Sequence, residues 1–558
     1  MQSADLIITN ARIITMDKDK PFADALAILG NRLLRVGSDA EVMELRAAHT
    51  RLHDNGGNSV IPGIVESHVH LFIGAVELDA LNIRDNIGLE AITKAVHDFR
   101  KLNPSLTMMN AIGAAHEQFG EGVSITRHLL DEIVSDIAFT IGCFDHHTVW
   151  ANSKALEAAG IMGGCDLPVG NEIVLDKDGL ATGELHEFAA FLPVIELSPT
   201  GGREALGIIT GEDPVPPATP DQREADIEFM RRGIARANSL GITSMHNMDG
   251  NWYQLELLHE LEKRGELNAR VEVPFHFKNY FDVSRVDEAV AFREKYKTDM
   301  LHSGRVKVFM DGVMETLTAL MLDDYPGHPG NTGAPLYTAE QFNALATRAD
   351  SHGLQISVHA IGDGAVRRTL DGFEVAQQKN GKRDSRHRIE HIELIDPVDV
   401  PRIAALGVVA SLQPIAGVGV PGAPLEPILS RVGDKLPWAY AWQTIRDTGA
   451  HVAFSSDWPV APLDPFIGMQ SAMTVRSLRE DCPDQSQNLM DTLHGFTLAG
   501  AHMEFMENRK GMIKEGYLAD IAVLNSNLEN TPAAEISWVK PLMTICDGRI
   551  VFEKIIPM

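Results

Sequence analysis

The stretch Ile61–Leu71, IPGIVESHVHL, decides how the rest of the chain is interpreted. Its apolar start, Ile61–Val65, follows a loop rich in Asn and Gly and predicts a buried strand. His68 and His70 lie at the far end of this strand, where side chains two positions apart point to the same face. Both imidazoles can therefore approach one point, and imidazole is the commonest protein ligand for a metal. Roughly one such pair is expected by chance among 22 His, so two histidines on a polar strand face remain an alternative at this point.

The length and composition limit the classes of protein that need to be considered. A chain of 558 residues predicts two or three domains, and 44% hydrophobic and 23% charged residues are typical of a globular protein. The net charge of −28 argues against binding to nucleic acid or to an anionic membrane surface. The four Cys are scattered, which predicts neither a disulfide framework nor a sulfur-based zinc site. With no secretory signal and no membrane-length apolar run visible, we expect a reduced, cytoplasmic protein.

Both ends of the chain show short apolar runs that predict strands and hairpins. Residues 1–60 contain four such runs, separated by Asn, Asp and Gly. In the tail, Ala519–Leu524, Met543–Cys546 and Arg549–Phe552 match them, Trp538-Val539 is also interpreted as strand, and Asp547-Gly548 is a strong hairpin signal. We therefore expect residues 1–60 and 505–558 to form one small β-domain.

The middle of the chain alternates predicted strands and helices. Helical stretches such as Asp221–Leu240, Ala339–His352 and Gly364–Gln378 separate most of the strands. Eight β/α units favour a closed TIM barrel over an open sheet. The eight predicted strands are Ile61–His70, Ile242–His246, Val271–Phe277, Val306–Met310, Ile356–His359, Arg388–His391, Val408–Leu412 and His451–Ser455.

An unusually long segment separates the first two predicted strands. Residues 73–220 contain strands and helices of their own, among them Ala138–Phe144 and Gly88–Leu102, and end in the Pro-rich Asp213–Pro220. We interpret this segment as an insertion, which leaves 61–72 and 221–504 for the barrel. An insertion after a barrel strand lies over the C-terminal face, where barrel active sites are found, so it is predicted to cap the substrate pocket.

Residue types that can bind a metal recur at the ends of the other predicted strands. Lys307 lies within the fourth strand, and His359 and His391 end the fifth and sixth. Asp457 follows the eighth strand. All would face the same rim as the first two histidines. One His at a strand end is more often structural, but six suitable residues at matching positions indicate a metal centre.

Several motifs at these positions resemble the amidohydrolase superfamily of metal-dependent hydrolases. They are PGIVESHVH, VKVFMDG, SVHAIGD, RIEHIEL and SSDWPV, in this order, and the tail Gly495–Leu524 resembles the closing segment of the superfamily. The motifs Asp145–Leu156 and Asp176–Glu187 resemble the large, inserted branch that includes N-substituted formamide deformylase. The resemblance extends over nearly the whole chain. It implies an α/β fold: a distorted (β/α)8 barrel, a β-sandwich from both chain ends and a large α/β insertion.

The resemblance also implies a centre of two metals, usually zinc. The ligands it implies are His68, His70 and Asp457 for the more buried metal, His359 and His391 for the outer metal, and Lys307, carboxylated by carbon dioxide, as a bridge. The alternative for the lysine is an unmodified, salt-bridging side chain beside a single metal. A ligand set of nitrogen and oxygen suits Zn²⁺ without excluding Mn²⁺, Fe²⁺ or Co²⁺.

The resemblance implies an enzyme that hydrolyses carbon–nitrogen bonds other than peptide bonds, in an amide-like small molecule such as an N-formyl or N-acyl amine. A metal-activated hydroxide would attack the carbonyl, and Asp457 would pass the proton to the leaving nitrogen. A lactone, carbamate or cyclic amide is the alternative substrate. A non-catalytic scaffold is a third interpretation, against which the full set of six ligands argues. The natural substrate and the oligomeric state stay open; a homodimer or a higher even-numbered assembly is compatible with the resemblance.

A few further residues are candidates for contact with substrate. His147, Trp150 and Asn152 lie in the inserted segment, in a motif that the resemblance places over the pocket. His147 would orient a carbonyl or an oxyanion, whereas Trp150 could equally anchor the core of the inserted segment. His246, at the end of the second strand, has a structural alternative as well. Leu317 stands where relatives often have Arg, which favours neutral, apolar substrates.

Overall fold

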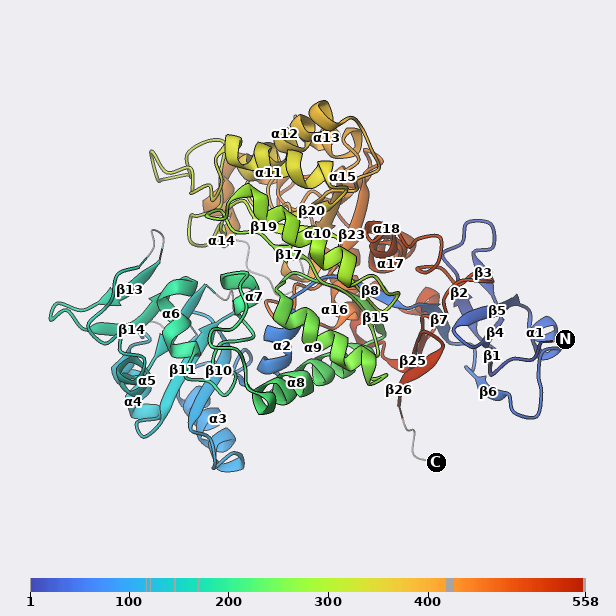
Figure 1. Ribbon diagram of the computed structural model, residues 1–558, viewed down its shortest axis with the longest axis horizontal. Coiled ribbons are helices and arrows are strands. Elements are labelled where there is room, and N and C mark those ends of the chain that lie inside the picture. Colours follow the sequence, from blue (N-terminus) through green and yellow to red (C-terminus); the bar gives the residue numbers. More distant parts are fainter. Residues whose placement is uncertain are drawn as a thin grey trace. The chain divides into compact units, whose positions relative to one another are not determined.

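The computed structural model describes residues 2–116, 118–120, 122–144, 147–167, 171–417 and 426–554 (Figure 1). The chain divides into two compact units, Met1–Leu71 with Ile234–Met558 and Phe72–Gly233. The predicted insertion, residues 73–220, falls within the second unit, and its role as a cap stays a prediction. Asp145 and His146, which begin one of the family motifs, lie outside the described residues.

Strands from both ends of the chain pair with one another in the first unit. In the described residues, one sheet has the order β5 (Arg32–Gly37), β4 (Ala25–Leu29), β1 (Leu6–Thr9) and β6 (Arg51–Asp54). A second has the order β26 (Arg549–Glu553), β25 (Pro541–Cys546), β24 (Ile521–Leu524), β7 (Ser59–Pro62), β2 (Arg12–Ile14) and β3 (Phe22–Ala23). One apolar cluster joins Leu26 of the first sheet to Val60 and Ile521 of the second. The small α1 (Asp39–Met43) packs beside β4, where Val42 shares a cluster with Ala25 and Ala27.

In the tail, the predicted turn is confirmed and one predicted strand is wrong. Asp547 and Gly548 have φ of +50° and +74° and join β25 to β26, as the hairpin signal predicts. Trp538-Val539 was predicted as strand, but the 3-10 helix Ala533–Trp538 occupies this place. The buried side chains there are Ile536 and Val539, three positions apart, which is the period of a 3-10 helix rather than of a strand.

Parallel strands follow the predicted chain order and place their carboxyl ends together. One sheet has the order β18 (Leu301–His302), β16 (Arg270–Glu272), β15 (Ile242–Asn247) and β8 (Ile64–Val69). The other has the order β17 (Phe275–His276), β19 (Arg305–Phe309), β20 (Gln355–Ala360), β21 (Arg388–His391), β22 (Val409–Leu412) and β23 (His451–Phe454). The predicted strand Val271–Phe277 is thus split at Pro274, which cannot donate to a ladder. A parallel bridge from Val69 to Trp458 joins β8 to the loop after β23.

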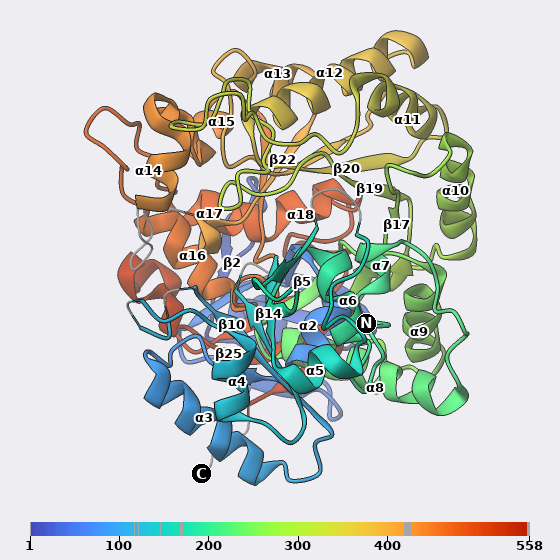
Figure 2. The same ribbon diagram turned by 90° about the vertical axis from the view of Figure 1, so that its left-hand side faces the viewer.

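Helices separate the parallel strands, as β/α units require (Figure 2). In the first unit they include α9 (Trp252–Lys263), α10 (Val286–Lys295), α11 (Ala339–Ser351), α12 (Asp363–Asn380), α13 (Val400–Ala405), α14 (Glu426–Val432), α15 (Trp442–Arg446), α16 (Pro465–Thr474), α17 (Leu489–Phe496) and α18 (Leu498–Met503). The long α8 (Pro220–Asn238) passes from one unit to the other. Within the part of the chain that the structure describes, no helix combines the length and the apolar surface needed to cross a membrane.

The second unit is built on a mixed sheet. Its described strands have the order β13 (Glu172–Leu175), β14 (Ala181–His186), β12 (Thr148–Ala151), β11 (Ala138–Cys143), β10 (Met108–Ala114) and β9 (Leu81–Asn82). Its helices include α2 (Leu71–Glu77), α3 (Leu89–Leu102), α4 (Arg127–Ile133), α5 (Ser153–Ala158), α6 (Phe188–Ile195) and α7 (Leu206–Ile209). Apolar clusters pack against this sheet, one of them around Phe139, Ile141 and Trp150.

The stretch Ile61–Leu71 forms two strands, where one was predicted. β7 ends at Pro62 and pairs with β24 from the tail, whereas β8 begins at Ile64 and pairs with β15. Gly63 separates them, and a Cβ at this position would lie 2.2 Å from Oγ1 of Thr243. The close approach of the backbone to Thr243 requires glycine here, because any side chain would occupy the same space. One short segment thus connects the sheet of the chain ends to the strand that carries His68.

We predict that Gly63→Ala destabilises the protein by about 1–3 kcal/mol, because the added methyl group overpacks a buried contact. Thr243 is 1% exposed and cannot turn toward solvent to relieve the clash. Chemical unfolding of the full chain measures the effect. Gly304→Ala is the matched control, since its Cβ would meet the nearest heavy atom, of Arg293, at 3.8 Å. Equal unfolding free energies for the two variants would contradict the prediction.

Candidate metal centre

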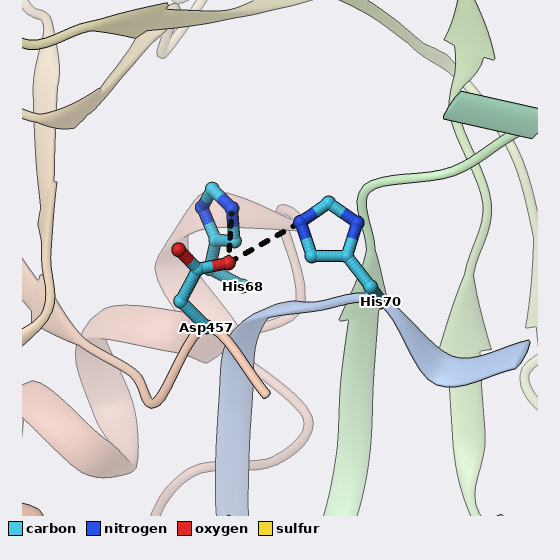
Figure 3. A group of neighbouring side chains, drawn as sticks. All are labelled: His68, His70 and Asp457. Atoms are coloured by element: carbon cyan, nitrogen blue, oxygen red, sulfur yellow. Dashed lines mark ion pairs between the residues drawn. The ribbon is translucent and has the colours of Figure 1, made fainter. Parts of the chain in front are cut away.

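His68 and His70 both face the carboxylate of Asp457 (Figure 3). The Nε2 atom of each imidazole lies 3.2 Å from Oδ1 of Asp457. Backbone hydrogen bonds fix this arrangement: Asp457 N donates to the His68 carbonyl at 3.0 Å, and His70 N donates to the Trp458 carbonyl at 2.8 Å. Among the described residues, these three side chains bring potential ligand atoms within 4.8 Å of one another, which is compatible with a shared metal ion.

Two buried carboxylates determine which nitrogen of each imidazole points at Asp457. Nδ1 of His68 lies 2.8 Å from Oε2 of Glu390, and Nδ1 of His70 lies 2.6 Å from Oδ1 of Asp249. An ionised carboxylate can only accept hydrogen bonds, so each Nδ1 carries the hydrogen and donates it. Nε2 is then the nitrogen of each imidazole that faces Oδ1 of Asp457, where either a proton or a metal ion can lie between them. Histidine–carboxylate pairs of this kind commonly orient metal ligands.

The pKa values of the site agree with a bound positive charge. Burial opposes protonation of His70, but the charge of Asp249 and the hydrogen bonds to Asp249 and Asp457 outweigh it and raise the pKa of His70 to about 10. Burial likewise opposes ionisation of Asp457, yet the neighbouring His68 and His70 hold the pKa of Asp457 well below its usual range. A proton or a metal ion between His70 and Asp457 would supply the positive charge that these pKa shifts favour. The residues present therefore fit a divalent metal.

His391 and His359 lie next to the first three side chains. The ring centroid of His391 is 4.9 Å from that of His68 and 4.5 Å from that of His359. Nε2 of His359 donates to the Gly312 carbonyl at 3.2 Å, and Nδ1 of His391 donates to Oε1 of Gln413 at 2.9 Å. Burial lowers the pKa of His391 to about 3 and that of His359 well below its usual value. Both are therefore neutral, with one lone-pair nitrogen each, which is the form that binds metals.

Lys307 projects from β19 and is completely buried. Its Nζ has no hydrogen-bond partner among the described residues and lies 4.8 Å from the ring centroid of Phe309. Burial lowers the pKa of Lys307 to about 8, although the charges of Glu390 and Asp457 oppose the shift. A buried amine without a partner is costly and calls for an explanation beyond packing. Its geometry is compatible with a modified or metal-bound nitrogen.

Two residues of the group adopt strained backbone conformations. His391 and Asp457 have φ of +76° and +62°, in the left-handed region that non-glycine residues rarely occupy. Each costs on the order of 1–3 kcal/mol, which the surroundings must supply. Glu66 contributes, since its buried Oε1 accepts from Ser456 N at 2.9 Å and from His68 N at 3.3 Å. The loop that carries Asp457 is thereby attached to the strand that carries His68.

His246 and Leu317, both candidates for contact with substrate, differ in their surroundings. His246 is 1% exposed; its Nε2 lies 3.2 Å from Oε1 of Glu504, and its Nδ1 lies 3.0 Å from the guanidinium of Arg388. With both ring nitrogens engaged, the structural role of His246 is favoured over contact with substrate. Leu317 is half-buried in the loop after β19, with φ of +61°.

The three candidates in the second unit have defined partners there. Asn152 is completely buried: its Oδ1 accepts from Phe139 N and Ala155 N, and its Nδ2 donates to two backbone carbonyls, so it caps α5 and is saturated. Trp150 is 2% exposed within the apolar cluster of the sheet. The burial of Trp150 favours its structural alternative, and the contacts of Asn152 give it a structural role within the second unit. His147 is half-buried, and its Nδ1 lies 3.0 Å from Glu187.

Sequence reasoning missed the side chains that orient the histidines. Asp249 follows β15, Glu390 precedes His391, and Gln413 follows β22, so all three lie at or near the carboxyl ends of parallel strands. That position was the available signal, because the same rim carries the candidate ligands. Which acidic or amide side chain meets which histidine depends on strand register, which periodicity does not give.

The chain is similar to known proteins over nearly its whole length. The profile described as the amidohydrolase family matches residues 51–552. The chain is 28% identical to the Arabidopsis thaliana protein LONG AFTER FAR-RED 3, over 98% of this chain and 92% of that protein. It is 24% identical to N-substituted formamide deformylase of Arthrobacter pascens, over 99% of each.

Solved structures are similar in fold. An uncharacterized metal-dependent hydrolase from Pyrococcus horikoshii OT3 has a TM-score of 0.70 at 22% identity, over 92% of this chain and 96% of that one. Atrazine chlorohydrolase from Arthrobacter aurescens TC1, complexed with zinc, has a TM-score of 0.53 at 13% identity, over 98% and 95%. Both support an α/β, TIM-barrel-like fold. The chain belongs to the amidohydrolase family, whose members are hydrolases, and the resemblance identified from the motifs is confirmed.

We predict that Lys307→Met stabilises the protein at pH 7 when metal and carbon dioxide are removed. The pKa of about 8 in the folded state lies below that of an unfolded lysine, so the buried ammonium is destabilising below pH 8 and this effect fades between pH 8 and about 10.4. The gain should be up to about 3 kcal/mol at pH 7 and should shrink at pH 9.5. Chemical unfolding at both pH values measures it, with the exposed Lys382→Met as control. A Lys307→Met variant that is less stable than the wild type at pH 7 would contradict the prediction.

Proposed function

We propose that the protein is a metal-dependent hydrolase of an amide-type carbon–nitrogen bond, with an N-formyl or N-acyl amine as the substrate class. The observation that carries the proposal is the convergence of His68 Nε2 and His70 Nε2 on Asp457 Oδ1, each at 3.2 Å, while buried carboxylates hold both Nδ1 atoms. Membership of the amidohydrolase family and similarity to a formamide deformylase support the choice of bond.

Two divalent metals, with zinc as the expectation, are proposed for this centre. His68, His70 and Asp457 would hold one, His359 and His391 the other, and a carboxylated Lys307 would be shared. When bound, such metals supply a water of lowered pKa and polarise a carbonyl. The neutral amine of Lys307 would form a bond to the carbon of carbon dioxide and release a proton to give the carbamate. Its lowered pKa and its lack of a hydrogen-bond partner among the described residues support this step over an unmodified lysine.

Asp457 is the residue proposed to move the proton. Its pKa lies well below the usual range, so the carboxylate is ionised at neutral pH and can accept a proton from the attacking water. It would then deliver this proton to the leaving nitrogen, which otherwise departs as a poor amide anion. Its strained backbone and its link through Ser456 and Glu66 to the His68 strand hold it in place for this role.

We further propose that the two parallel sheets act as one distorted (β/α)8 barrel, closed through the Val69–Trp458 bridge. The sheets from the chain ends would form the β-sandwich of the family, since one apolar cluster contains residues of both. In a barrel the carboxyl ends of all strands share one rim, which agrees with the placement of the candidate ligands.

We predict that Asp457→Asn remains folded but loses on the order of 10²–10⁴-fold in kcat, because the amide cannot accept the proton. Turnover of an N-formyl amine by the zinc-loaded enzyme is the measurement, with circular dichroism to verify the fold. Asp447→Asn is the control. Asp447 is exposed at the C-terminal end of α15, so this variant should keep wild-type turnover. Undiminished kcat in Asp457→Asn would exclude the proton-transfer role.

A second prediction concerns the substrate. With Leu317 rather than Arg in the loop after β19, neutral amides should have a kcat/KM at least about tenfold above carboxylated analogues, a difference of about 1.4 kcal/mol. Leu317→Arg should shift this ratio toward the carboxylated amides, since Arg pairs with carboxylates. Leu322→Arg adds the same charge elsewhere in the loop and should shift it less. Faster turnover of lactones, carbamates or cyclic amides than of any open amide would favour the alternative bond.

A further inference from the structure

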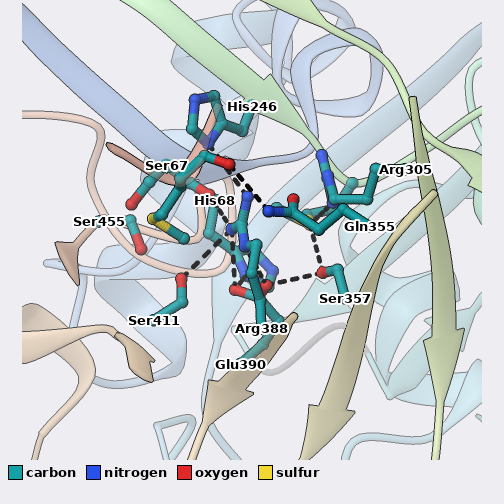
Figure 4. A network of polar contacts seen from close by, with 12 residues as sticks. Ser67, His68, His246, Arg305, Gln355, Ser357, Arg388, Glu390, Ser411 and Ser455 are labelled. Atoms are coloured by element: carbon teal, nitrogen blue, oxygen red, sulfur yellow. Dashed lines mark hydrogen bonds and ion pairs between the residues drawn. The ribbon is translucent and has the colours of Figure 1, made fainter. Parts of the chain in front are cut away.

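A buried arginine, Arg388 of β21, lies in a polar network that includes the candidate ligand His68 (Figure 4). Its guanidinium faces the carboxylate of Glu390, with Nε 2.9 Å from Oε1 and NH2 3.2 Å from Oε2. The same NH2 group donates to the Ser67 carbonyl at 2.5 Å. Arg388 therefore contacts the backbone immediately before His68 as well as the carboxylate that binds its imidazole.

Glu390 is the connection between this arginine and the candidate ligand. Its Oε2 accepts from Nδ1 of His68 at 2.8 Å, and its Oε1 accepts from Oγ of Ser357 at 2.6 Å. Both oxygens also face the guanidinium of Arg388, at 2.9 and 3.2 Å. Glu390 is thus an acceptor with fixed orientation, which no neutral side chain can reproduce.

The other contacts of Arg388 and Glu390 come from four further strands. NH1 lies 3.0 Å from Nδ1 of His246 on β15, and NH2 lies 3.4 Å from Oγ of Ser411 on β22. Ser67 belongs to β8 and Ser357 to β20. Since four other strands hold the pair, Arg388 and Glu390 have little freedom to shift. A side chain fixed in this way can set the position of His68 precisely enough for a metal.

We infer that Arg388 and Glu390 are positioning residues of the metal centre. Arg388 fixes the orientation of the Glu390 carboxylate, and Glu390 accepts the hydrogen of His68 Nδ1, so that Nε2 is the nitrogen that faces Asp457. The contact of Arg388 with the Ser67 carbonyl fixes the backbone from which His68 projects. This inference rests on the proposed function, because it concerns affinity for a metal at His68.

The chemistry of an amide shows why the charge at position 390 is needed. In Glu390→Gln the NH2 group must replace either Oε1, which faces Arg388 Nε and Ser357 Oγ, or Oε2, which faces Arg388 NH2 and His68 Nδ1. In either place its hydrogens meet donor hydrogens of Arg388, and this displaces the guanidinium or the amide. In the place of Oε2 it also moves the imidazole hydrogen of His68 to Nε2, where a metal can no longer bind. Either outcome weakens metal binding without removing a ligand.

The test compares zinc affinity of the full-length wild type and Glu390→Gln by competition with a chromophoric chelator. We expect affinity to fall about 10–100-fold, the usual cost of losing such a partner. Glu390→Asp retains two acceptor oxygens and should lose less, and Arg388→Lys, which retains the charge without the planar fork, should also weaken binding. Ser411→Ala is the matched control, because Ser411 contacts the same guanidinium but is hydrogen-bonded to neither His68 nor Glu390 in the described contacts.

Thermal unfolding with and without zinc separates positioning from general stability. A positioning role predicts that Glu390→Gln and Arg388→Lys lose more of the zinc-induced rise in Tm than Ser411→Ala does. Unchanged zinc affinity in both variants, with a lower Tm of the metal-free protein, would overturn the inference and leave the proposed function intact. A wild-type protein that binds no divalent metal would overturn both.

Discussion

The structure depends on the hydrogen bonds that two buried carboxylates accept from Nδ1 of His68 and His70. These bonds leave both Nε2 atoms facing Oδ1 of Asp457 at 3.2 Å, an arrangement that needs a proton or a metal ion between the nitrogens and the oxygen. The raised pKa of His70 reflects this need, because Asp249 and Asp457 outweigh the effect of burial. Buried polar groups are costly without partners, so the site requires a positive charge at this place.

The short strand β21 carries both a candidate metal ligand and the side chains that orient another ligand. Along Arg388–His391 the first and third side chains point into the network and support His68, and the fourth is itself a candidate ligand. His391 ends the strand with a φ of +76°, and its ring lies 4.9 Å from that of His68 and 4.5 Å from that of His359. One short strand thereby links the candidate positions of the two metals, so a change in its register would disturb both.

Much of this could be predicted from the sequence, because strands that end in His, Lys or Asp mark one rim of a parallel α/β fold. The order of the parallel strands and the meeting of His68, His70 and Asp457 follow from that pattern. The contribution of both chain ends to one sheet follows instead from their short apolar runs and the Asp547-Gly548 turn. Hydrogen-bond partners could not be predicted, since they depend on which residues of distant strands lie in register. Local interruptions were missed for a related reason: the break at Gly63 arises from contact with Thr243, far along the chain. The predicted strand at Trp538-Val539 is wrong for another reason, because the burial of Ile536 and Val539 follows the period of a 3-10 helix.

Crystals grown with zinc and measured on both sides of the zinc absorption edge would test the central claim most directly. The account predicts an anomalous peak for a zinc ion that is bound by Nε2 of His68, Nε2 of His70 and the carboxylate of Asp457. Ordered density for these three side chains with zinc bound elsewhere, or with no zinc at all, would contradict it.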